Sequence, residues 1–222
     1  TKMGKALVKL DGKGYFQVSN KKIILPSSYF APIAYYSILL KNSNCVIDIH
    51  EKFIKQSIRN RCTIFSTNGS LNLSIPKIRK NSSKAIIKDI KISYAEPWQK
   101  IHWKTIITCY NSSPFFEFYR DKFEFIYRKK EKYLIDFNYK TISLMFEIFN
   151  AKKNIVLSDK YETNHISDFR NYSFHTIEDT YYDQVFSENL GFISNLSIID
   201  LLFNLGPESL DTINRIDISK IY

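Results

Sequence analysis

Residues 50–62 gather many of the side chains that could do chemistry into one connection between two strand-like runs. The stretch contains cations, amides, a hydroxyl, an imidazole and a thiol, and connections on a rigid scaffold are where binding and catalytic groups tend to lie. A loop that serves only solubility needs charge, but it does not need Gln56, Ser57, Asn60 and Cys62 as well. Composition leaves two interpretations open, a solvated charged loop and a functional connection.

The segment before this stretch predicts a strand, a tight turn and the start of a helix. Residues 23–25 form a short apolar run that Pro26 stops, and Ser28 with the serine before it offers an N-cap for a helix over residues 30–40. A helix N-terminus presents free N–H groups and about half a positive charge, which suits a phosphate or a carboxylate. No glycine fingerprint accompanies the turn, so the pattern is weak support for nucleotide binding.

The spacing of the histidines and cysteines supports neither a catalytic dyad nor a metal site. His102 and Cys109 share one face of a helix predicted over residues 98–110, but they lie two turns, roughly 10 Å, apart, too far for a direct dyad. A histidine on such a helix is more often a hydrogen-bonded structural residue than a catalyst. His165 and His175 lack the spacing of a metal site, and we predict no structural metal.

The spacing of apolar residues predicts that these groups lie on an α/β fold. Residues 23–25, the helix over 30–40 and a mostly apolar strand over 45–49 make a βαβ unit, whose strands we expect to be parallel and buried. An Asn68-Gly69 turn, the strongest short hairpin signal, follows between two strand-like segments.

The rest of the chain is predicted to be mainly helical. We expect helices over residues 98–110, 114–130, 133–149 and 201–204, the last capped by Ser197, and strands over residues 86–94 and 154–158. The predicted fold is a single domain with a mixed, partly parallel sheet, begun by the βαβ unit and the Asn-Gly hairpin and packed against a mostly helical C-terminal half. Residues 1–20 are interpreted as a leader of doubtful order and residues 21–222 as the domain.

Composition bounds the environment and the partners. The 222 residues are 44% hydrophobic, which is ample for a core, and three cysteines without CxxC spacing indicate a reducing compartment. No apolar run approaches the roughly 20 residues of a membrane helix, so we expect a soluble, cytoplasmic protein. The net charge of +10 favours anionic partners, although the lysines are spread along the chain and an ordinary basic surface is the simpler explanation.

Six blocks of the sequence, taken in order, carry a resemblance to a known family. The blocks are residues 25–36, 50–62, 68–76, 98–104, 113–117 and 195–207. Together they resemble the WbqC-like family of bacterial proteins over about residues 23–210. Some members of that family lie in gene clusters for O-antigen and other surface polysaccharides, where attachment of an acyl or aminoacyl group to an amino sugar has been suggested. The resemblance implies a transferase of this kind.

The family pattern also ranks the candidate residues. Other members carry Asn-Arg-Asn where this chain has Asn60-Arg61-Cys62, and acidic residues near the position of His50, so Cys62 and His50 are not expected to be general catalytic machinery. The candidate catalytic residues are His102, Asn60 and Ser57, and the candidate substrate-binding residues are Ser28, Tyr29, Phe53, Lys55, Arg61 and Trp98.

Most of these roles have a chemical basis. Lys55 and Arg61 suit a phosphate or a carboxylate, the first as a point charge and the second as a bidentate fork. His102 is the best general base near neutral pH for an attacking amine, and Asn60 can orient a carbonyl or stabilise an oxyanion. The leading hypothesis is a transferase acting on a nucleotide-linked sugar or a similar anionic substrate, with the phosphates at the helix start near Ser28. No particular cofactor is implied.

Two other classes of function stay open. A nucleic-acid-binding protein would use the net charge and the basic loop over residues 77–84, and its binding would weaken steeply as salt rises. A non-catalytic assembly protein would have the side chains of Lys55, Arg61 and His102 pointing apart or used up in buried ion pairs.

Overall fold

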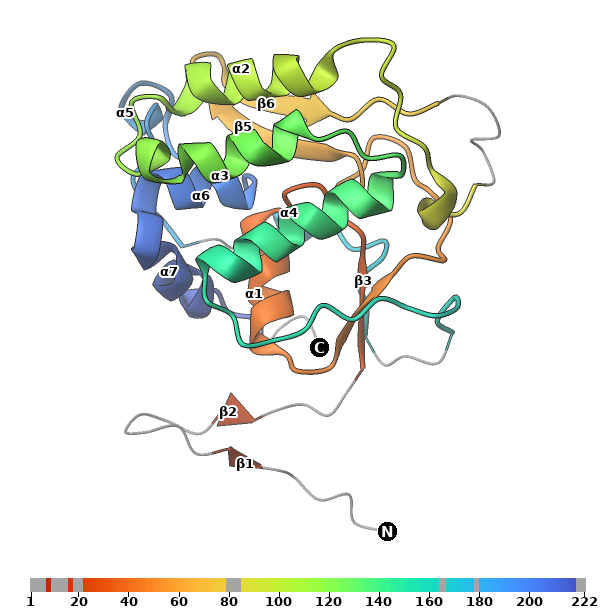
Figure 1. The fold of residues 1–222 in the computed structure, drawn as a ribbon. Helices are drawn as coiled ribbons and strands as arrows, with labels where there is room; N and C mark the ends of the chain where they lie inside the picture. Colours follow the sequence, from red (N-terminus) through yellow and green to blue (C-terminus); the bar gives the residue numbers. More distant parts are fainter. Residues whose placement is uncertain are drawn as a thin grey trace.

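The fold is a small parallel sheet, a separate hairpin and a set of covering helices, seen in a computed structural model (Figure 1). The structure describes residues 7–8, 16–17, 22–78, 85–163, 167–177 and 180–218. Most of the predicted leader, most of the basic loop over residues 77–84, and His165 lie outside the described residues. Within the leader, β1 (Leu7–Val8) pairs with β2 (Phe16–Gln17) in an antiparallel fashion.

The predicted βαβ unit is confirmed. It consists of β3 (Ile23–Pro26), α1 (Ile33–Lys41) and β4 (Cys45–Asp48), and both strands are parallel and buried. A third parallel strand, β7 (Ser167–Asp168), pairs with the other edge of β3 and makes β3 the centre of the sheet. The predicted strand over residues 154–158 is reduced to one parallel bridge between Leu157 and Ile47.

The helix in this unit begins three residues later than the sequence predicts. Phe30 has a φ of 39°, in the left-handed region, so the chain cannot be helical there, and α1 starts only after Pro32. The N–H of Ile33 donates to the carbonyl of Leu196 over 3.1 Å, and Ser28 is fully buried and does not cap the helix. The segment around Leu196 therefore covers the start of α1. A ligand at the expected anion site near Ser28 would not find an exposed helix N-terminus there.

The hairpin is confirmed, with a shifted turn. β5 (Arg61–Ser66) pairs antiparallel with β6 (Gly69–Ser74), and Ser66 lies opposite Gly69. Gly69 has a φ of 93°, a conformation that favours glycine, and it opens the second strand rather than occupying the turn. In Figure 1, α2 (Trp98–Tyr110) lies over this hairpin.

The predicted long helices are present. They are α2, α3 (Phe116–Arg128) and α4 (Leu134–Ile148), followed by α5 (Ser187–Leu190), α6 (Ile198–Leu205) and α7 (Ser209–Arg215). Ser197 caps α6 as predicted by accepting a hydrogen bond from the N–H of Ile199, but the helix is longer than residues 201–204. Short 3₁₀ turns also occur: η1 (Ile87–Asp89), η2 (Phe174–Thr176) and η3 (Gly206–Glu208).

The predicted strand over residues 86–94 is wrong. Its apolar alternation instead forms η1 between single bridges, in which Ile86 pairs with Lys52, Lys91 with Tyr133 and Ile92 with Lys77. Alternation of apolar and polar residues shows only that one face of a segment is buried. This segment buries Ile87 and Ile90, but no continuous strand lies beside it to pair with.

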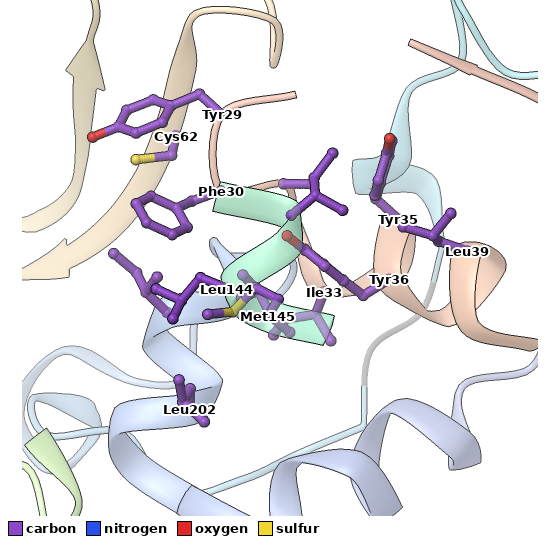
Figure 2. Packing of buried hydrophobic residues seen from close by; sticks show 14 of the residues in the cluster. Tyr29, Phe30, Ile33, Tyr35, Tyr36, Leu39, Cys62, Leu144, Met145 and Leu202 are labelled. Atoms are coloured by element: carbon purple, nitrogen blue, oxygen red, sulfur yellow. The ribbon is translucent and has the colours of Figure 1, made fainter. Parts of the chain in front are cut away.

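Aromatic side chains dominate the core around α1 (Figure 2). Tyr29, Phe30, Tyr35 and Tyr36 are all fully buried, and Figure 2 shows Cys62 beside Tyr29. Because large rings fill this region, the segment between β3 and α1 is a core element rather than a surface loop. In the described part of the chain, no helix has the length and apolar character that crossing a bilayer requires.

Candidate functional site

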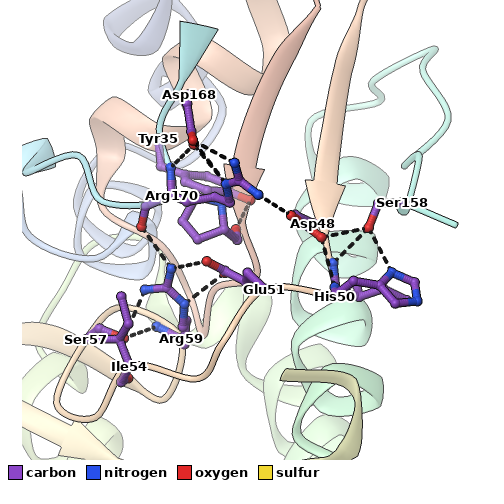
Figure 3. Close-up of polar contacts among 12 residues, drawn as sticks. Tyr35, Asp48, His50, Glu51, Ile54, Ser57, Arg59, Ser158, Asp168 and Arg170 are labelled. Carbon is purple, nitrogen blue, oxygen red and sulfur yellow. Dashed lines mark hydrogen bonds and ion pairs between the residues drawn. The ribbon is translucent and has the colours of Figure 1, made fainter. Parts of the chain in front are cut away.

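Charged side chains converge at the carboxyl edge of the parallel strands (Figure 3). Asp48 ends β4 and Asp168 ends β7, on either side of the central strand. Open parallel sheets bind their ligands outside the carboxyl ends of the strands, so this edge is the first place to look for a site.

Arg170 joins the two outer strands at this edge. Its Nη1 donates to Asp48 over 2.6 Å, and its Nη2 donates to Asp168 over 2.7 Å. The guanidinium carbon also lies 4.2 Å from the centre of the Tyr161 ring. Arg170 is 5% exposed, so its charge is balanced inside the protein by two carboxylates rather than by water.

Glu51 and Arg59 form a second buried ion pair next to the first. Two nitrogens of Arg59 bind the two carboxylate oxygens of Glu51, in the bidentate fork that arginine favours. Arg59 Nη2 also donates to the carbonyl of Arg170 over 2.8 Å, which ties the two pairs into one network. Burial raises the pKa of Glu51 to about 7, although the hydrogen bonds from Arg59 oppose the rise.

Asp48 carries a polar extension of this network. Its Oδ1 accepts hydrogen bonds from the hydroxyl of Ser158 and from the backbone N–H of His50, each over 2.8 Å. The imidazole Nδ1 of His50 lies 3.2 Å from the same hydroxyl. Asp48 is fully buried, and both of its carboxylate oxygens accept hydrogen bonds, from these partners and from Arg170.

A cavity of about 460 Å³ opens beside the two ion pairs. We call it the arginine cavity, and its polar lining includes Gln56, Ser57, Arg59, Arg61, Asn72 and Arg170. Two of its three arginines are already paired with carboxylates, as described for Glu51 and Asp48. The volume lies within the range of about 300–1,000 Å³ that is usual for small-molecule sites.

Arg61 differs from the other two arginines. Its Nε donates to the hydroxyl of Ser74 over 2.9 Å, which fixes the side chain along the hairpin. Its two terminal nitrogens have no hydrogen-bond or ion-pair partner among the residues that the structure describes. A fixed guanidinium with two available donors in a cavity is suited to a carboxylate or a phosphate.

His102 lies in a separate, buried aromatic cluster. Its Nδ1 is 3.1 Å from the hydroxyl of Tyr29, which in turn is 2.5 Å from the hydroxyl of Tyr127. The Trp98 ring contacts the imidazole edge-on, with ring centres 5.1 Å apart. Burial lowers the pKa of His102 to about 4, against the opposing effect of a hydrogen bond with the Ser74 backbone, so the imidazole is neutral at pH 7.

Comparison with known proteins adds the family. The family model of the WbqC-like protein family matches residues 27–172 and 168–212. The chain belongs to this family. A search of curated proteins and a search of solved structures find no match. The match spans α1, β4, the hairpin, α2 to α6 and β7, so both ion pairs and the arginine cavity lie inside the WbqC-like region.

Part of the predicted site in this WbqC-like chain comes together. Ser57 and Arg61 both line the arginine cavity. The hydroxyl of Ser57 accepts a hydrogen bond from Arg59 Nη1 over 3.3 Å and donates one to the carbonyl of Ile54. Asn60, which precedes Arg61 in the chain, is half-buried and does not line the cavity, and its Nδ2 donates to the carbonyl of Ile75 over 3.2 Å.

Other predicted residues lie elsewhere. Lys55 is exposed on the same loop but does not line the arginine cavity. Phe53 is buried beneath the Lys77 ammonium group, which lies 5.3 Å from the centre of its ring. Ser28 and Tyr29 are fully buried, and Trp98 lines a different cavity at the start of α2.

Sequence reasoning missed the residues that build the network, namely Asp48, Glu51, Arg59, Asp168 and Arg170. A signal existed for Asp48, because it ends a predicted buried parallel strand, where ligand-binding groups concentrate. Arg170 gives no such signal, because its segment has no helical or strand periodicity and its partner Asp48 is 122 residues away. Within the described residues, no group of His, Cys, Asp and Glu side chains is arranged to hold a metal ion.

Proposed function

We propose that this WbqC-like protein is a transferase that adds an acyl or aminoacyl group to the amine of an amino sugar or a similar activated anionic substrate in surface-polysaccharide biosynthesis. Family membership supports the biological setting. The observation that carries the chemical part is Arg61, whose terminal nitrogens are available in a cavity where Arg59 and Arg170 are already paired.

The different partners of the three arginines support an anionic substrate. Glu51 balances Arg59, and Asp48 and Asp168 balance Arg170, so these two guanidinium groups act as fixed walls. The two terminal nitrogens of Arg61 are left to donate to the ligand. A single fork that is held in place by Ser74 favours one carboxylate or one phosphate group, bound in a bidentate manner.

The catalytic part of the proposal keeps Asn60 and His102 in the roles given by their chemistry. Asn60 would orient the reacting carbonyl beside Ser57, and His102 would take the proton of the attacking amine. A neutral imidazole can accept a proton, although a pKa near 4 makes it a weak base, and its hydrogen bond to Tyr29 must break or pass the proton on.

A non-catalytic binding protein is the second candidate function, and one observation favours it. Lys55, Arg61 and His102 do not meet in one cavity, since Lys55 is exposed, Arg61 lines the arginine cavity and His102 is buried in the aromatic cluster. Such a protein would still bind an anion at Arg61 but would transfer nothing.

The test combines ligand binding with product analysis. Purified protein is screened by thermal shift against nucleotide-linked amino sugars and acyl or aminoacyl donors, and the hits are incubated in pairs and analysed by mass spectrometry. A ligand at a hundredfold excess over its dissociation constant stabilises the native state by about 2.7 kcal/mol, or roughly 5–10 °C for a chain of this size.

Variants of equal charge make the screen specific. Arg61→Gln should abolish the shift caused by the ligand that binds the arginine cavity, whereas Arg215→Gln, an exposed position on α7, should leave it unchanged. An acylated amino sugar formed by the unmodified protein and absent with Arg61→Gln would support the transferase. Binding that depends on Arg61 without any product would favour the non-catalytic protein. If the shifts of all ligands survive Arg61→Gln, the arginine cavity is removed from the proposal.

A further inference from the structure

A second cavity, of about 530 Å³, lies between the first half of α2 and the end of α3. We call it the aromatic cavity, and its lining includes Tyr94, Trp98, Trp103, Tyr127, Lys100 and Lys130. Its volume also falls within the range of about 300–1,000 Å³ that is typical of small-molecule sites. Its lining shares no residue with the arginine cavity, so the two are distinct sites.

The rings of the aromatic cavity are arranged in two pairs. Trp103 stacks on Tyr127 with ring centres 5.9 Å apart and planes 24° apart. Tyr94 lies next to Trp98 with ring centres 6.1 Å apart and planes 32° apart. Stacked aromatic surfaces of this kind are the usual platform for a nucleobase, because every base has a flat face that can stack.

The walls of the aromatic cavity are held in place by hydrogen bonds to neighbouring residues. The hydroxyl of Tyr94 donates to the carbonyl of Glu131 over 2.8 Å, and that of Tyr127 is 2.5 Å from the hydroxyl of Tyr29. The side chain of Gln99 donates to the carbonyl of Lys129, which joins the start of α2 to the end of α3. A site whose walls are already ordered loses little conformational freedom when a ligand enters.

The rim of the aromatic cavity carries a positive charge that a ligand could use. Glu124 is paired with Arg128 over 2.7 Å, so these two charges cancel. Lys100 and Lys130 are exposed and have no ion-pair partner within the described residues, and the ammonium of Lys130 lies 5.2 Å from the centre of the Tyr94 ring. The remaining carboxylate of the lining, Glu96, offsets only one of these two lysines. The rim therefore keeps a net positive charge, which favours an anion.

We propose that the aromatic cavity binds a nucleoside phosphate, with the base against the aromatic walls and the phosphate at Lys100 and Lys130. A transferase requires two substrates, and the nucleotide is assigned to one of them. Only this assignment rests on the proposed function. Binding itself does not depend on the transfer reaction. The arginine cavity then holds the anionic group of the other substrate.

The chain contains a built-in probe for this proposal. It has two tryptophans, Trp98 and Trp103, and both line the aromatic cavity. A base that stacks there should quench the tryptophan fluorescence, whereas a ligand in the arginine cavity contacts no tryptophan. Fluorescence is excited at the red edge of indole absorption, where nucleotides absorb little, during titration with uridine and adenosine mono- and diphosphates.

The expected result is saturable quenching by nucleotides and none by ribose 5-phosphate, which lacks the base. Exchanging both rim lysines, as Lys100→Gln with Lys130→Gln, should weaken binding by about tenfold or more, since charge-assisted contacts to the phosphate are lost. Lys104→Gln, an exposed lysine of α2 that does not line the cavity, is the matched control and should bind as the unmodified protein does.

Three results would overturn the proposal. These are no saturable quenching by any nucleotide, quenching that is unaffected by the lysine exchanges, and binding of single-stranded oligonucleotides without binding of mononucleotides. Arg61→Gln separates this proposal from the proposed function. Nucleotide quenching that persists in Arg61→Gln supports the aromatic cavity by itself, while its loss there would show that the two cavities were wrongly treated as separate.

Discussion

Removing Arg59 should be among the most damaging single changes in the protein. The side chains of Arg59 and Glu51 are only 3% and 4% exposed, and the pair is bidentate. Arg59→Met keeps a long unbranched side chain but leaves the Glu51 carboxylate without its cation. Breaking a buried pair in this way costs about 3–5 kcal/mol, which corresponds to a fall in Tm of roughly 6–20 °C for a chain of this length.

The loss should grow with pH. The folded pKa of Glu51 is raised to about 7, against 4.5 for an ordinary glutamate, so its contribution to stability is full below about pH 4.5 and is lost as the pH rises through 7. Without Arg59 the pKa rises further, and the decline continues above pH 7. The Arg59→Met variant should be closest to the unmodified protein near pH 5 and furthest from it near pH 8.

Chemical and thermal unfolding at both pH values measures these differences. Arg128→Met is the matched control, because it breaks an i,i+4 pair with Glu124 in which the arginine side chain is 72% exposed, and such pairs contribute about 0.5 kcal/mol or less. The double exchange Arg59→Met with Glu51→Gln should recover much of the lost stability, since no buried charge is then left unpaired. A loss below about 1 kcal/mol for Arg59→Met, or one that does not depend on pH, would refute the reasoning.

Three further predictions concern single residues. Arg61→Gln should lower the free energy of unfolding by less than about 1 kcal/mol in urea unfolding, because within the described part of the chain its only side-chain hydrogen bond is to Ser74. Gly206→Ala should cost about 1–3 kcal/mol by thermal unfolding, since Gly206 has a φ of 55° and a methyl group there would collide with the Phe115 ring. Asp200→Asn should cost about 1–3 kcal/mol near pH 7, because the buried carboxylate accepts hydrogen bonds from two tyrosine hydroxyls, at 2.7 Å each, and the amide offers one oxygen fewer. Since burial raises the pKa of Asp200 to about 6, the stability that this group contributes should fall as the pH rises from about 4 to 6, and this slope should vanish in Asp200→Asn.

The sequence by itself determined the local architecture of this protein. The βαβ unit, the hairpin and the long helices follow from apolar spacing and turn residues that are close together in the chain. In α3, four aromatic residues recur at helical spacing and are all buried, namely Phe116, Tyr119, Phe123 and Tyr127. Local periodicity is enough for such elements because neighbouring residues decide which face is buried.

Tertiary structure decided where the chemistry lies. The short β7 became part of the sheet only because β3 had a free edge, and it brought Arg170 to Asp48 from 122 positions away. Likewise, Ser28 does not cap α1, because Phe30 is left-handed and the helix begins only after Pro32, where the N–H of Ile33 donates to the carbonyl of Leu196. The pairing of Arg59 and Arg170 with carboxylates, which leaves Arg61 as the available cation, depends on contacts between segments far apart in sequence. No local pattern encodes such contacts, since burial and charge balance are properties of the folded whole.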